Sequence, residues 1–153
     1  MDYNFDMNEA PAQAVLSIRK RISVRNLPQE LGQAYTAIFE YLKEIGAEAM
    51  VLAPFAGYYN MDMEDLDVEM GFTIAGPLPG KGDVKANEIP AGKQVDYLFK
   101  GPYSGMEPVY NALNQWMNEK GYVPTGTCYE FYFNSPLEVP ESELLTKIMF
   151  PLK

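Results

Sequence analysis

The chain has 153 residues, of which 47% are hydrophobic and 22% are charged, and this globular composition excludes a disordered or fibrous protein. Its 21 acidic and 12 basic residues give a net charge of −9, so the surface repels phosphate groups and we expect no direct nucleic-acid binding. Because the sequence contains no histidine, imidazole catalysis and His-ligated metals are also excluded.

The first half of the chain is predicted to contain one helix among three strands. Apolar positions recur every three or four residues over 31–45, which indicates an amphipathic helix, and Gly46 is placed to end it. The Gly- and Pro-rich segment 76–82 then separates this half from the next. The strands are expected at residues 14–24, 50–59 and 66–74.

The second half is predicted to repeat this order around a helix at 105–120. Two such halves, at about 14–76 and 84–152, form one α+β domain that spans residues 1–153. We expect duplicated β-α-β-β units, a pseudo-twofold antiparallel sheet and a central cleft at the seam. The strands of this half are expected at 84–89, 93–100, 128–133 and 146–152. The two helices align through Tyr35 with Tyr110, Tyr41 with Trp116 and Gly46 with Gly121.

Glu130 interrupts the aromatic strand predicted at 128–133. Strand alternation places Cys128, Glu130 and Tyr132 on one face. An ionised carboxylate in an apolar site is costly unless it is paired, so its pKa should rise or the group should meet a cation. Glu130 can be the charged anchor of an aromatic pocket, where it binds a cation or acts as a general acid or base. Alternatively, it lies on an exposed edge or pairs with a structural Lys or Arg.

Other acidic residues are expected to be exposed. Asp67 and Glu69 alternate with apolar residues, which is typical of a half-solvated strand whose Met70 and Phe72 form core or cavity wall. The acidic turn 60–65 lacks the glycine and terminal glutamate of a calcium-binding EF-hand loop. We therefore expect a solvated turn there and no metal site.

Aromatic side chains near the second helix are further candidates. Tyr103 precedes this helix and either lines the seam or packs against the helix entrance. Tyr110 and Trp116 lie on its apolar stripe, where core packing is the default. Covalent catalysis is not expected, because Cys128 and the hydroxyl residues have no histidine to activate them.

The order of short motifs along residues 14–152 resembles that of the GyrI-like small-molecule-binding family, whose fold is shared by the effector-binding domains of AraC-type and MerR-type multidrug regulators. These motifs are Gly101-Pro102-Tyr103, Trp116, Gly121, Tyr129-Glu130-Phe131-Tyr132 and the final run 146–152. The resemblance implies a cleft between the halves, with a glutamate at its base that receives cationic lipophilic compounds. The regulators carry a DNA-binding domain for which these 153 residues have no room, so we expect no direct transcriptional control.

On this resemblance, Glu130 is the ligand-binding glutamate, and Tyr58 faces Tyr132 across the seam. If Lys147 alternates with Met149 into the cleft, its ammonium offsets the charge of Glu130 and favours an anionic or neutral ligand. The candidate lining residues are Tyr58, Met70, Phe72, Tyr103, Tyr110, Trp116, Tyr132 and Met149.

Three functions follow as hypotheses. The first is a stand-alone protein that binds a lipophilic cationic or aromatic xenobiotic. The second, implied by some stand-alone family members, is hydrolysis of cyclopropane-type electrophiles, with Glu130 and an aromatic partner among Tyr103, Tyr132 and Trp116. The third is a protein-interaction module that contacts gyrase or a separate regulator.

We expect a cytoplasmic protein, monomeric or homodimeric, with no cofactor and no membrane association. The sequence has no signal peptide and no apolar run long enough to cross a bilayer, and its single cysteine, Cys128, leaves no internal disulfide. If the protein is an enzyme, Glu130 and Tyr103 are the candidate catalytic residues.

Overall fold

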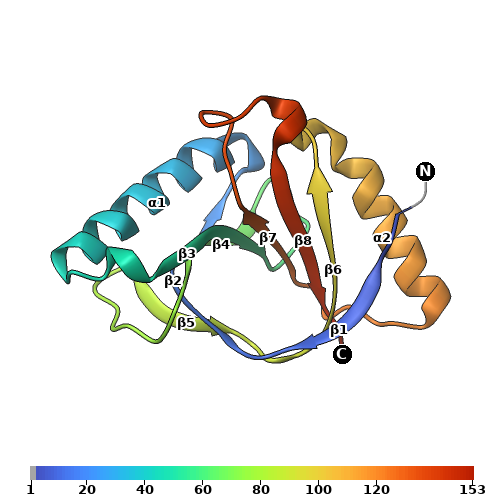
Figure 1. Ribbon diagram of the computed structural model, residues 1–153, viewed down its shortest axis with the longest axis horizontal. Helices are drawn as coiled ribbons and strands as arrows, with labels where there is room; N and C mark the ends of the chain where they lie inside the picture. Colours follow the sequence, from blue (N-terminus) through green and yellow to red (C-terminus); the bar gives the residue numbers. More distant parts are fainter. Residues whose placement is uncertain (1–2) are drawn as a thin grey trace. The chain divides into compact units, whose positions relative to one another are not determined.

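The computed structural model describes residues 3–153, which divide into two units (Figure 1). Unit 1 combines the N-terminal segment through Ala10 with Gly92–Lys153, and unit 2 is Pro11–Ala91. Within the described residues, each unit has one main helix and one run of antiparallel strands, which confirms the predicted α+β class. Among residues 3–153, no helix is both long and apolar enough to span a membrane.

Unit 2 is built from a strand, a helix and two strands, with a further strand at its edge. Its helix is α1 (Leu27–Glu44), and Gly46, just beyond the helix end, has a φ of 69° that favours glycine. The strands are β2 (Gln13–Ile22), β3 (Val51–Tyr58), β4 (Leu66–Ile74) and β5 (Lys85–Ile89). They pair antiparallel in the order β3-β4-β2-β5, so β4 has a neighbour on each side.

Helix α1 packs its apolar stripe on the sheet of unit 2. The ring centroid of Phe72 lies 5.4 Å from that of Tyr35 and 6.2 Å from that of Phe39. Met70 is fully buried. The structure therefore places Met70 and Phe72 on the sheet face covered by α1. The buried residues of the helix are Ala34, Ile38, Tyr41 and Leu42.

Unit 1 repeats the order strand, helix, strand, strand. Its helix, α2 (Glu107–Lys120), ends at Gly121, whose φ of 78° is the left-handed conformation typical of glycine at a helix end. The strands β1 (Asp6–Ala10), β6 (Gly92–Lys100), β7 (Cys128–Tyr132) and β8 (Leu145–Pro151) pair antiparallel in the order β1-β6-β8-β7. Short 3-10 turns in the two units lie at Val24–Asn26, Glu48–Met50, Tyr103–Gly105 and Glu141–Glu143.

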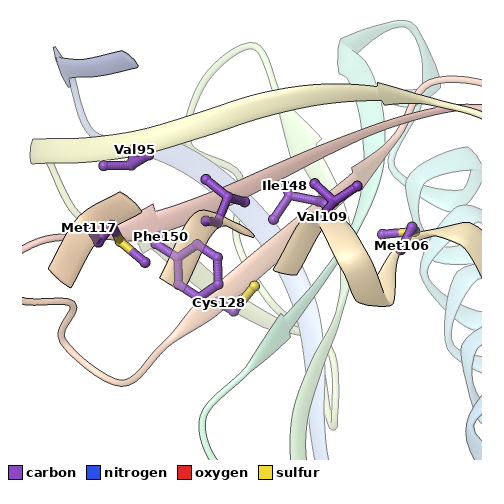
Figure 2. Packing of buried hydrophobic residues seen from close by; sticks show 8 residues of the cluster. Val95, Met106, Val109, Met117, Cys128, Ile148 and Phe150 are labelled. Carbon is purple, nitrogen blue, oxygen red and sulfur yellow. The ribbon is translucent and has the colours of Figure 1, made fainter. Parts of the chain in front are cut away.

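Helix α2 covers one face of the unit 1 sheet (Figure 2). Val109 and Met117 of α2 meet Ile148 and Phe150 of β8, and burying each such side chain contributes about 1.5–3 kcal/mol. Cys128 belongs to the same buried cluster. Because side chains alternate along a strand, β7 presents its residues 130 and 132 on this helix-covered face as well.

Each unit contains an edge strand from the other half of the sequence. β1 pairs with β6, placing Met7 opposite Val95, and β5 pairs with β2, placing Asn87 opposite Val15. These boundaries differ from the predicted half-repeats, because the strand expected at 84–89 belongs to unit 2. The periodicity of a strand's sequence predicts which of its residues share a face, but it does not predict which strand pairs with it.

Candidate functional site

Glu130 accepts hydrogen bonds at both of its carboxylate oxygens. The Tyr132 hydroxyl donates to Oε1 over 2.7 Å, and the Tyr110 hydroxyl donates to Oε2. The Cys128 thiol in turn donates to the Tyr110 hydroxyl, with 3.5 Å between sulfur and oxygen. These contacts confirm that Cys128, Glu130 and Tyr132 share a face, and they fix the orientation of the carboxylate.

The aromatic residues around Glu130 come from β7, α2 and the turn before α2. The ring of Tyr110 packs edge-on against Phe150, with centroids 5.9 Å apart. Tyr103 packs edge-on against Tyr132, with centroids 6.1 Å apart, and is 44% exposed. The site therefore joins the α2 core at Tyr110 and reaches solvent at Tyr103.

Burial raises the pKa of Glu130 above its ordinary value, and the hydrogen bonds from Tyr110 and Tyr132 offset this rise only in part. Burial also raises the pKa of Tyr110, and it raises the pKa of the Cys128 thiol to about 12. The pKa of Tyr103 is raised by burial and by the charge of Glu130. These three neighbours stay protonated at neutral pH, so Glu130 is the group among them that titrates.

Among the described residues, no Lys or Arg forms an ion pair with Glu130. Lys147 stands opposite Phe131 in the β7–β8 register, whereas Glu130 stands opposite Ile148, so Lys147 and Glu130 lie on different faces. The Lys147 ammonium is 3.8 Å from Asp96. The alternative in which Glu130 pairs with a structural cation is therefore wrong, and Lys147 does not offset its charge.

For two predicted lining residues of unit 1, the structure shows contacts or a sheet face that do not involve Glu130. The ring of Trp116 packs against Phe5, with centroids 5.9 Å apart. Met149 stands opposite Tyr129 in the strand register and is buried on the face of the sheet opposite to Glu130. Alternation along β8 places Met149 on the face that also carries Lys147, so its expected role in lining a ligand site stays a prediction.

The remaining candidates belong to unit 2. Met70 and Phe72 lie on the face covered by α1, and Tyr58 is half-buried at the end of β3. The expectation that Tyr58 faces Tyr132 stays a prediction.

Tyr110 is the aromatic partner of Glu130 that sequence reasoning missed. The partners expected from the sequence were Tyr103, Tyr132 or Trp116, and of these Tyr132 donates to the carboxylate. Core packing was the default expectation for Tyr110, which was also named as a candidate lining residue but not as the aromatic partner of Glu130. The signal that could have found it is its hydroxyl, because a tyrosine on a buried helix stripe usually has a hydrogen-bond partner.

Unit 2 contains a second hydrogen-bonded carboxylate, that of Glu69, which is buried, so the expectation that Glu69 is exposed is wrong. It is 2% exposed and accepts hydrogen bonds from Ser17 over 2.5 Å, from Asn87 over 3.0 Å and from the Tyr59 hydroxyl. The strand β4 lies between β2 and β3, and the sheet face that carries Glu69 is also covered, as buried Phe55 shows. Three neutral donors from within the unit satisfy this carboxylate.

Other acidic groups pair near the surface. Arg19 contacts Asp67 at 2.7 Å, and Arg21 contacts Asp65 at 2.9 Å. Exposed pairs of this kind contribute about 0–1 kcal/mol each. Within residues 3–153, no group of three or more Cys, Asp or Glu side chains is arranged to hold a metal ion.

Comparisons with known proteins agree with this architecture. A family model described as the GyrI-like small molecule binding domain matches residues 3–153. The crystal structure of the EcmrR C-terminal domain superposes with a TM-score of 0.78 and 25% sequence identity, covering 100% of this chain and 99% of that chain. A search of curated proteins finds no match.

Two less similar structures share the fold. A hydrolase from Listeria innocua has a TM-score of 0.67 at 13% identity and covers 99% of this chain and 93% of its own. SAV2435, solved with bound tetraphenylphosphonium, has a TM-score of 0.64 at 8% identity and covers 98% of this chain and 94% of its own. Likeness at these identities establishes the fold alone.

Proposed function

The chain belongs to the GyrI-like family of small-molecule-binding domains, and from this we propose that it binds small lipophilic cations with Glu130 as the charged anchor. The observation that carries the proposal is a carboxylate in an aromatic environment whose hydrogen-bond partners are two neutral phenols. A buried carboxylate is costly when it ionises without a counter-charge. A cationic ligand supplies that counter-charge.

The surroundings of Glu130 suit such a ligand. The two phenols hold the carboxylate in place before binding, which reduces the ordering cost that a ligand must overcome. The partly exposed ring of Tyr103 offers a π-face, and a cation over such a face gains about 0.5–2 kcal/mol. The net charge of −9 attracts cations over a longer range. SAV2435, which has the same fold, binds the lipophilic cation tetraphenylphosphonium.

Titration calorimetry with tetraphenylphosphonium and with a rhodamine-type dye tests the role of the charge. We expect Glu130→Gln to weaken binding by about tenfold to hundredfold, equivalent to about 1.4–2.8 kcal/mol, because the amide keeps the shape of the side chain and removes its charge. Glu138→Gln is the matched control, since Glu138 is exposed and this substitution changes the net charge equally. We expect the control to bind like the wild type.

Unchanged affinity of Glu130→Gln for both probes would contradict the anchoring role. Equal weakening in Glu130→Gln and Glu138→Gln would attribute the effect to overall charge and would contradict it as well. Near-ultraviolet circular dichroism of both variants checks that the tyrosine packing around residue 130 is retained.

A second candidate function is hydrolysis of cyclopropane-type electrophiles, and the raised pKa of Glu130 favours it. A carboxyl group of raised pKa is suited to general acid–base catalysis near neutral pH. In this reaction the oxygen of water bonds to a ring carbon, a carbon–carbon bond of the ring breaks, and Glu130 carries the proton from the water to the released carbon. The Tyr110 hydrogen bond orients the carboxylate for this transfer.

Mass spectrometry of a cyclopropane-bearing alkylator incubated with the protein tests this candidate. Turnover by the wild type should fall by about 100-fold or more in Glu130→Gln, in line with the contribution of a general acid–base group. Absence of wild-type turnover across a varied panel of such compounds would remove the hydrolase from consideration. Binding to gyrase or to a separate regulator stays a prediction from the sequence.

A further inference from the structure

Thr146 carries a buried hydroxyl that has no hydrogen-bond partner among residues 3–153. The residue is 0% exposed. Proteins leave few buried polar atoms unpaired, because such an atom loses its hydrogen bonds to water without replacement. An unpaired hydroxyl next to a candidate binding site is therefore a group that a ligand can satisfy.

The strand register places Thr146 beside the Glu130 site. Thr146 in β8 stands directly opposite Tyr132 in β7, so both side chains project from the face that carries Glu130. Glu130 stands opposite Ile148, two residues along β8, so Glu130 and Thr146 are diagonal neighbours. Diagonal neighbours lie roughly 7–8 Å apart, with their Cβ atoms somewhat closer, a span that one small ligand head group can bridge. On its other side, Thr146 stands opposite Phe99 of β6.

The hydrogen-bonding capacity that remains at this site is mainly that of an acceptor. The hydroxyl protons of Tyr110 and Tyr132 are donated to Glu130, and the Cys128 thiol proton is donated to Tyr110. Each oxygen of Glu130 keeps a further lone pair, and the Thr146 hydroxyl can accept as well as donate. A ligand that brings both a positive charge and an N–H group complements this arrangement.

We propose that Thr146 is a specificity-determining residue that selects protonated amines over quaternary cations, an inference that rests on the cation-binding function proposed above. The ammonium charge of the ligand faces Glu130, and one of its N–H groups donates to Oγ1 of Thr146. A quaternary ammonium or tetraarylphosphonium ion has no N–H group. Such an ion leaves the Thr146 hydroxyl unpaired, so it binds through its charge and apolar surface alone.

Calorimetry at pH 7 with a matched ligand pair tests this selection. The pair is N,N-dimethyl-1-naphthylmethylamine, which is protonated at this pH, and its N-methylated quaternary salt. We expect wild-type protein to bind the protonated amine about fivefold to tenfold more tightly, the ratio given by one hydrogen bond. Thr146→Val keeps the side-chain shape and removes the hydroxyl. It should weaken amine binding by this factor and leave the affinity for the quaternary salt within about twofold.

Thr146→Ser is the matched control, because it retains the hydroxyl and should retain the preference for the amine. Without ligand, Thr146→Val should melt at a higher temperature than the wild type, since it removes an unpaired buried polar atom. A lower melting temperature would reveal an internal partner for the hydroxyl and would overturn the proposal. Equal binding of both ligands by the wild type, or equal weakening of both by Thr146→Val, would also overturn it.

Glu130→Gln, measured with the same two ligands, separates this inference from the function on which it rests. If neither ligand binds, or if binding is insensitive to Glu130→Gln, the cation-binding function fails and the Thr146 proposal fails with it. If both ligands bind and both depend on Glu130, but Thr146→Val leaves their ratio unchanged, the Thr146 proposal alone fails.

Discussion

Gly71→Ala is expected to lower the free energy of unfolding by more than about 4 kcal/mol. A Cβ atom at Gly71 would lie 2.0 Å from the carbonyl oxygen of Leu16 and 2.8 Å from the Cα of Ser17. Both are backbone atoms of the neighbouring strand β2, and a backbone cannot turn away as the end of a flexible side chain can. The strands β2 and β4 would have to separate, which breaks the sheet of unit 2 at its centre.

Chemical denaturation followed by far-ultraviolet circular dichroism measures this loss. Gly32→Ala is the matched control in the same unit, because Gly32 lies within α1 and a Cβ atom there meets nothing within 4 Å. We expect the control to stabilise the protein by about 0.5–1 kcal/mol, since alanine is the better helix former. An unfolding midpoint for Gly71→Ala equal to that of the wild type would show that the strands adjust, contrary to this expectation.

The same strand contact positions the buried carboxylate of unit 2. Ser17 stands opposite Gly71 in the register, and its hydroxyl donates to Glu69. Glycine at position 71 therefore lets the two strands approach closely enough for Ser17 to serve as one of the three donors to Glu69. In this part of the fold, the close pairing of β2 with β4 and the hydrogen bonding of the buried Glu69 carboxyl group therefore depend on one another.

Periodicity made the helices and most strands predictable from the sequence. The strand expected at 66–74 is β4 with the same bounds, and the helix expected at 105–120 is α2, which begins at Glu107. These segments repeat apolar residues at the spacing of one buried face, and that spacing is a local property of the chain. The edge strand β1 has no such spacing, because its sequence Asp-Met-Asn-Glu-Ala is mostly polar.

Glu69, which is buried, and Glu130, which is half-buried, show what the alternation of apolar and polar residues cannot predict. Glu69 and Glu130 both alternate with apolar neighbours, yet the sequence led us to expect an exposed Glu69 and left Glu130 open between an aromatic pocket, an exposed edge and a structural ion pair. Alternation reports which side chains share a face, and whether that face is covered depends on elements distant in the sequence. For the same reason, the contact between Tyr110 on α2 and Glu130 on β7 needs the packing of a helix on a sheet, which the sequence alone did not provide.

Changing the pH is expected to move ligand affinity and protein stability in opposite directions through the same group. Because the pKa of Glu130 is raised in the folded protein, its carboxyl group gains a proton at a higher pH than an ordinary glutamate does. A permanently charged cation such as tetraphenylphosphonium should therefore bind more weakly as the pH falls through this raised pKa. The total change should approach the about tenfold to hundredfold loss expected for Glu130→Gln, since protonation and amidation remove the same charge.

Stability of the ligand-free protein should show the opposite slope. As the pH rises from the unfolded to the folded pKa of Glu130, the unfolded chain loses its proton first, so the folded state binds more protons and its stability falls. Other carboxylates titrate in the same range, and the difference between wild type and Glu130→Gln isolates the contribution of Glu130.

Thermal melts and titration calorimetry across pH 4–8 measure the pH dependence of stability and of affinity. Both dependences should appear in the wild type and in Glu138→Gln, and both should be smaller in Glu130→Gln. If Glu130→Gln retains the full pH dependence of binding, the titrating group at the site is not Glu130, and the charge that the ligand meets must come from elsewhere in the chain.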